Sequence, residues 1–178
     1  MWVGLAREPT RELVEQAFAR HASGAKLWWG DLADPGFDAD IAISIEPNPS
    51  EFPFVLHGWV VDGQESQQYE LGLRLAGELC MLLDCPTICD GSHHGPTKSP
   101  CWSIVWQCGV PFLADDCGTL FADFQDDMSL EEWRQLGPVK ILHAIGIDPW
   151  PFDFSPTSTA AAPSQHASAA ARGAAPRA

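Results

Sequence analysis

The chain has 178 residues, of which 24 are acidic and 10 are Lys or Arg, giving a formal net charge of −14. This length suits one domain, and 46% hydrophobic residues with eight Trp are enough for a sizeable core. The negative charge disfavours binding to nucleic acid and to anionic membranes and favours a cationic protein partner. No apolar run approaches the roughly 20 residues that a membrane-spanning helix needs.

The amino-terminal residues lack a basic segment followed by a long apolar run, so they do not resemble a secretory signal. Six cysteines without such a signal are more typical of reduced thiols than of a disulfide framework. We therefore expect a cytoplasmic protein.

The first half of the chain predicts one helix followed by strands. Thr10 is a suitable N-cap for an amphipathic helix that ends near Gly24. Residues 26–29 fit a short strand, and residues 41–45 and 54–61 alternate between the two faces of a sheet. Because the link between the last two strands is short, we expect them to pair antiparallel.

The next segment, residues 66–84, predicts a long buried helix. Apolar side chains cover more than half of its circumference: Tyr69, Leu71, Leu73, Leu75, Ala76, Leu79, Cys80, Leu82 and Leu83. Glu70, Arg74 and Glu78 share the remaining side. A helix with so wide an apolar surface should be covered on more than one side. Pro86 ends it, and residues 87–89 then fit a short strand.

The last third predicts a hairpin, a short helix and a tail. Residues 101–108 and 110–114 fit two paired strands, and Ser129 opens a capping box for a short helix. Residues 139–147 fit either a helix or a strand, and we predict a helix. Ala, Ser and Pro dominate from residue 155 onward, which predicts disorder.

Together these elements predict one α+β domain over residues 1–154 and a disordered tail over residues 155–178. The expected architecture is a mostly antiparallel sheet packed against a central buried helix, residues 66–84, with one or two further helices.

The cysteines and histidines do not predict a metal site. Their spacing includes no C-x2-C pair of the kind that zinc sites use, and Cys80 already lies on the apolar side of the long helix. Neither glycine-rich phosphate-binding motif occurs. We therefore predict no metal and no cofactor.

One loop carries residue types that catalysis uses. Asp90, Ser92, His93 and His94 lie together after a strand, with Cys89 before them and Cys101 beyond, which suggests a small hydrolase-like enzyme as an alternative function. Ser92 does not match G-x-S-x-G, so a polar connecting loop is the favoured interpretation.

Aromatic residues offer a second kind of site. Trp59, Trp102 and Trp106 lie on predicted strands, where their rings can stack against a ligand, although core filling is the favoured role.

The charge distribution carries the main functional hypothesis. Seven acidic residues with no Lys or Arg among them form the predicted partner-binding set: Asp115, Asp116, Asp123, Asp126, Asp127, Glu131 and Glu132. We predict an acidic protein-binding domain that engages a cationic protein partner, such as an immunity-type inhibitor of a basic toxin or enzyme. The competing interpretation is a solvated surface with favourable helix-dipole charges.

Overall fold

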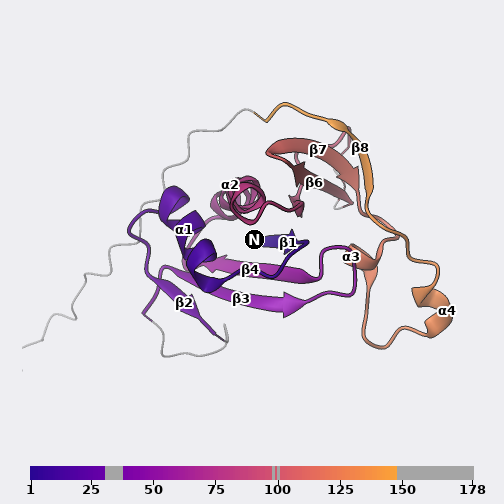
Figure 1. Ribbon diagram of the computed structural model, residues 1–178, viewed down its shortest axis with the longest axis horizontal. Coiled ribbons are helices and arrows are strands. Elements are labelled where there is room, and N and C mark those ends of the chain that lie inside the picture. Colours follow the sequence, from indigo (N-terminus) through magenta and orange to yellow (C-terminus); the bar gives the residue numbers. More distant parts are fainter. Residues whose placement is uncertain (31–37, 98, 100, 148–178) are drawn as a thin grey trace, which may run out of the picture.

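The computed structural model describes residues 1–30, 38–97, 99 and 101–147 (Figure 1). Within these residues, eight strands form one sheet: β1 (Trp2–Leu5), β2 (Leu27–Trp29), β3 (Ile41–Pro47), β4 (Phe54–Val60), β5 (Thr87–Asp90), β6 (Trp102–Gln107), β7 (Val110–Asp115) and β8 (Lys140–Ala144). The helices are α1 (Arg11–His21), α2 (Glu65–Leu83), α3 (Leu120–Asp123) and α4 (Leu130–Trp133).

The strand order is β2-β3-β4-β1-β5-β6-β7-β8, with β1 at the centre. Only the β2–β3 pair is parallel among the described strands; the others are antiparallel. Because β1 runs antiparallel to both β4 and β5, the β4–α2–β5 segment is a crossover between parallel strands with β1 inserted between them. The predicted α+β architecture with a mostly antiparallel sheet is confirmed.

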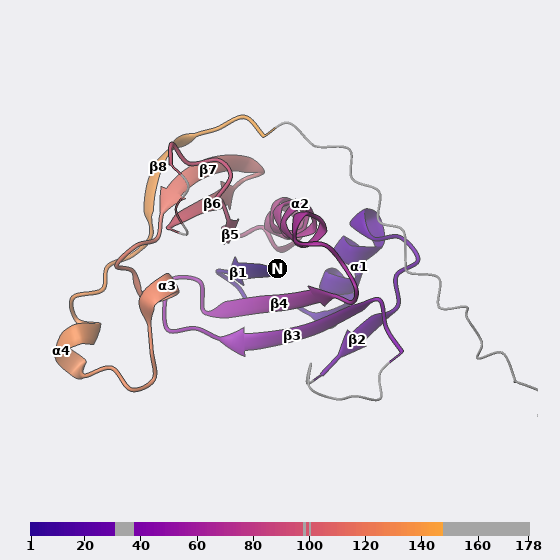
Figure 2. The same cartoon turned by 180° about the vertical axis from the view of Figure 1, so that it is seen from behind.

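Helix α2 packs on one face of this sheet, which we call the inner face. The sheet curves around α2, with β2 to β4 on one side and β6 to β8 on the other (Figures 1 and 2). Leu71, Leu75 and Leu79 are fully buried. The Thr87 hydroxyl on β5 also donates a 2.7 Å hydrogen bond to the Ala76 carbonyl, which fixes the helix to the strand that follows it.

The polar side of α2 is also covered. Arg74 pairs with Glu70 at 2.9 Å, as the i, i+4 spacing predicts. Glu78 forms an ion pair with Arg20 and lies 3.5 Å from His21 Nε2, both at the end of α1. The prediction that α2 would be covered on more than one side is therefore confirmed, because the sheet takes its apolar side and α1 part of its polar side.

The opposite, outer face of the sheet carries a smaller apolar cluster built on Phe52, Ile88, Val105 and Ala114. Phe121, on α3, packs against this cluster and lies directly over β1. The outer face is thus covered partly by a side chain of the segment that follows β7.

Three elements differ from the sequence-based expectations. Neither β1 nor α3 was predicted, since both have only four residues. The helix predicted over residues 139–147 is wrong, because strand β8 pairs there with β7. Every residue of β8 is exposed. The apolar residues that suggested a buried helix are therefore not buried in this strand. The predicted disordered tail lies outside the described residues.

The close packing over β1 gives a test of the fold. A Cβ at Gly4 would lie 2.5 Å from Ile88 Cγ2 and 2.6 Å from Phe121 Cε2. We expect Gly4→Ala to lower the free energy of unfolding by about 1–3 kcal/mol, measured by urea denaturation, because the added methyl overpacks the outer cluster.

The matched control is Gly146→Ala, where an added Cβ would meet nothing within 4 Å. Its effect should stay within about 0.5 kcal/mol. Equal effects of the two substitutions would contradict the close approach of Phe121 to β1.

Candidate functional site

The acidic segment, residues 115–132, leaves the sheet at the end of β7 and contains α3 and the start of α4. Its α4 part extends away from the sheet (Figures 1 and 2). A disulfide between Cys101 and Cys117 attaches its beginning to the residue before β6. A β-bridge between Thr119 and Gly137 closes its base. The segment is therefore a projection held at its root.

Asp116 is a structural residue. It is only 4% exposed, and the Ser103 hydroxyl on β6 donates a hydrogen bond to its carboxylate. Burial raises the pKa of Asp116, because the charged form loses its hydration. Thr119 donates a further hydrogen bond to the Asp116 carbonyl. Asp116 is thus part of the packed root, where its carboxylate is largely shielded from solvent.

Three other acids of the predicted set hold local backbone. Asp115 accepts a hydrogen bond from the Cys117 amide, and Asp123 accepts one from the Gly118 amide. Glu132 forms the predicted capping box with Ser129, and the hydrogen bonds from Ser129 lower the pKa of Glu132. These carboxylates shape the segment, although Asp123 and Glu132 remain exposed.

The remaining three acids, Asp126, Asp127 and Glu131, are exposed and make no hydrogen bond or ion pair with the described residues. They lie close in the chain to two exposed apolar side chains of α4, Leu130 at 61% and Trp133 at 38% exposure. We call these five residues the α4 surface. Apolar side chains bordered by charges are typical of a protein-binding patch.

Leu130 and Trp133 were not among the candidate site residues predicted from the sequence. The available signal was the capping box, which predicted a helix at that place with Leu and Trp in its single turn. A helix of four residues has no second turn to show periodicity, so its apolar side chains could not be assigned to core or surface from sequence.

The second candidate, the loop Asp90–His94, lies beside the first turns of α2. Asp90 accepts a 2.8 Å hydrogen bond from the Ser92 amide, and the His94 amide donates to the Gly91 carbonyl at 2.8 Å. No hydrogen bond joins the side chains of Asp90, Ser92 and His93 in the described part of the chain. A serine–histidine–aspartate relay is therefore not assembled in this geometry.

Both histidines of this loop stack on Tyr69 of α2, with ring centroids 4.4 Å away for His93 and 6.4 Å for His94. Burial lowers the pKa of His94 and raises that of Tyr69. The stack fixes the loop to α2, and burial favours the neutral forms of both Tyr69 and His94.

The cysteines of the enzyme hypothesis are not available as nucleophiles. Cys89 is fully buried, and this burial raises the pKa of its thiol. Cys101 is bonded to Cys117, so the expectation of reduced thiols is wrong for this pair. Since disulfides persist mainly in oxidising compartments, this bond removes the reduced-thiol argument for a cytoplasmic location.

Two kinds of feature are absent from the described residues, a metal-binding cluster and a membrane-spanning helix. No group of three or more His, Cys, Asp or Glu residues there is arranged to hold a metal ion. None of the helices in that part of the chain combines the length and apolarity needed to cross a membrane.

Comparison with protein-family models, with curated proteins and with solved structures finds no match for this chain.

The structural role of Asp116 predicts a contrast between two substitutions. Asp116→Ala leaves the buried Ser103 hydroxyl without its acceptor and should cost about 1–3 kcal/mol of unfolding free energy. Asp116→Asn keeps an acceptor oxygen and removes the buried charge, so it should be neutral or stabilising at neutral pH.

The raised pKa of Asp116 also predicts how the stability of the protein depends on pH. Because the folded-state pKa of Asp116 is raised, the folded protein holds this proton more tightly than the unfolded chain does. Stability attributable to Asp116 should fall as the pH rises from 3.8 through the raised pKa and stay constant above it. Urea denaturation at several pH values should show this decline in the unsubstituted protein and not in Asp116→Asn. The same pH profile in both proteins would contradict a buried carboxylate at Asp116.

Thiol accessibility predicts an order of chemical labelling. Cys108 is exposed, Cys85 is half-buried, and Cys80 and Cys89 are buried. Iodoacetamide should therefore modify Cys108 first in the native protein, while Cys80 and Cys89 react only after unfolding. Cys101 and Cys117 should be labelled only after reduction, as peptide mass spectrometry can show. Labelling of Cys101 in unreduced native protein would contradict the disulfide.

Proposed function

We propose that this chain is a protein-binding domain that engages a basic protein through the α4 surface. An inhibitor of the immunity type, which masks a basic toxin or enzyme, is the form of this function that best matches a net charge of −14. Residues Asp126, Asp127 and Glu131 would attract the partner, and Leu130 and Trp133 would bind it.

The observation that carries this proposal is the exposure of Leu130 and Trp133 on a segment that extends from the sheet. Burying an exposed Trp and Leu against a partner is a recognised source of binding energy, because such side chains remove large apolar areas from water. Both residues lie outside the two apolar clusters of the core, so the fold does not need their exposed surface.

The charges have a separate part in the proposal. Unpaired carboxylates around an apolar anchor speed association with a basic protein and disfavour acidic competitors. Arg134 directly follows Trp133, whereas Asp126, Asp127 and Glu131 precede it, so the positive charge stands at the C-terminal end of this stretch. The proposal leaves out Asp115, Asp116, Asp123 and Glu132, because each accepts a hydrogen bond, Asp116 from Ser103 on β6 and the others from backbone amides of the segment.

The test begins with affinity capture from the source cells at low salt, followed by mass spectrometry. The captured basic protein is then used in binding kinetics with purified variants. We expect simultaneous reversal of Asp126, Asp127 and Glu131 to Lys to lower the association rate constant by about tenfold at low salt. Leu130→Ala should act mainly on the dissociation rate.

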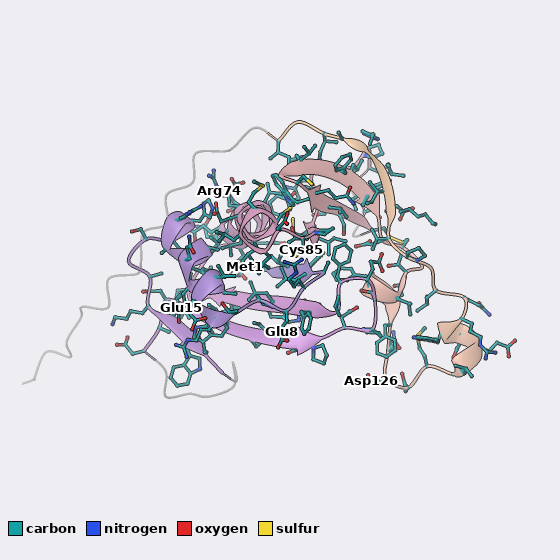
Figure 3. All side chains as sticks on the ribbon, viewed as in Figure 1. Met1, Glu8, Glu15, Arg74, Cys85 and Asp126 are labelled. Carbon is teal, nitrogen blue, oxygen red and sulfur yellow. A yellow bond between two sulfur atoms is a disulfide. The ribbon has the colours of Figure 1, made fainter. Side chains whose placement is uncertain are left out.

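A matched control separates local charge from net charge. Asp126→Lys and Glu8→Lys change the net charge equally, and both replace exposed residues at different places on the molecule (Figure 3). Asp126→Lys should slow association more than Glu8→Lys does. Equal effects of the two variants, or an association rate that does not depend on salt, would contradict the α4 surface as the contact.

A further inference from the structure

A cavity of about 730 Å³ lies at the N-terminal end of α2, beside the start of β1 and the end of β4. Four aromatic residues line it, Trp2, Trp59, Tyr69 and His93, together with two acidic residues, Glu65 and Asp90. Its volume falls in the range of roughly 300–1,000 Å³ that is usual for small-molecule sites. We call it the α2 cavity.

The charge of the α2 cavity is one-sided. No Lys or Arg side chain is among the described residues that line it. The positive group found there is the amino group of Met1, which donates hydrogen bonds to the Gly58 carbonyl at 2.9 Å and to Gln68 Oε1 at 3.2 Å. Burial lowers the pKa of this amine, and the nearby Asp90 carboxylate opposes that shift in part because it favours the charged form. The lining therefore favours a cation over an anion.

The two carboxylates differ in solvent exposure and in hydrogen bonding. Glu65 is exposed at the start of α2, whereas Asp90 is half-buried and uses one oxygen to accept the hydrogen bond from the Ser92 amide. No hydrogen bond reaches the second oxygen of Asp90 from the described residues. A cationic group in the cavity would find a partly desolvated acceptor there, where an ion pair is stronger than at a fully exposed site.

The aromatic side chains are placed by the fold. Tyr69 and His93 stack on each other, which fixes both rings at the wall of the cavity. Trp59 lies on β4, opposite Ala42 of β3, and is 54% exposed. A Trp with so much exposed surface contributes little to the core, whereas its face attracts cations through the ring quadrupole.

We propose that the α2 cavity binds an organic cation, an alkylammonium or guanidinium group, held by the face of Trp59 and the carboxylate of Asp90. Such a cation can be a free amine or the Lys or Arg side chain of a basic protein. This site is separate from the α4 surface, so its test does not depend on the proposed function.

The experiment is isothermal titration calorimetry of the full chain with choline and with its uncharged analogue, 3,3-dimethylbutan-1-ol. The two probes have almost the same shape, so a difference reports the charge. We expect choline to bind about tenfold more tightly than the alcohol. Equal affinities of the two probes, or no binding of choline, would overturn the proposal.

Variants then locate the binding. Trp59→Leu should weaken choline binding by about tenfold, whereas Trp59→Phe, which keeps an aromatic face, should retain most of it. Asp90→Asn preserves the acceptor for the Ser92 amide and removes the charge, so a similar loss is expected. Glu8→Gln, an exposed position outside the cavity, should leave the affinity unchanged. Unchanged affinity in both Trp59→Leu and Asp90→Asn would overturn the assignment.

A second set of probes distinguishes the two sources of the cation. The acetylated and amidated tripeptides Gly-Lys-Gly and Gly-Gln-Gly present a side chain with and without charge. Tighter binding of the Lys peptide than of choline would support recognition of a basic protein, and tighter binding of choline would support a free amine. In either case each charged probe must bind more tightly than its neutral partner, and equal affinities within the choline pair overturn the proposal.

Discussion

The burial of α2 is the constraint on which the other parts of the structure depend. Its apolar surface is too wide for a single neighbour, so the sheet must curve around it and α1 must lie beside it. Two local features allow this fit. The Thr87 hydroxyl donates a hydrogen bond to the Ala76 carbonyl of α2. Gly77 leaves room for the ring of Trp106, because a Cβ at position 77 would lie 3.2 Å from that ring.

Placing both long helices on the inner face has a consequence for the outer face. That face must be covered by short segments, and Phe121 of α3 does so over the centre of the sheet. The chain therefore has to leave β7, cross the outer side and return to form β8. The acidic segment is this excursion, which explains why its root is packed and bonded while α4 extends into solvent.

Neighbouring acids in one run have different physical roles. Asp116 stabilises the root through Ser103, Glu132 caps α4, and Asp126 remains solvated. A count of charges treats them alike, although Asp126, Asp127 and Glu131 accept no hydrogen bond from the described residues and the other four do. The same distinction applies to the cysteines, since Cys89 is a core residue and Cys101 is a cross-link.

The sequence alone determined the elements whose signals are local. Periodicity predicted α2, alternation predicted β3 and β4, and Thr10 and Ser129 marked two helix starts. Tertiary structure decided β1, whose four residues become the central strand only because β4 and β5 supply hydrogen-bond partners on both sides. It also decided β8, the Cys101–Cys117 bond and the α2 cavity, because each depends on contacts between segments far apart in the chain, which local pattern does not encode.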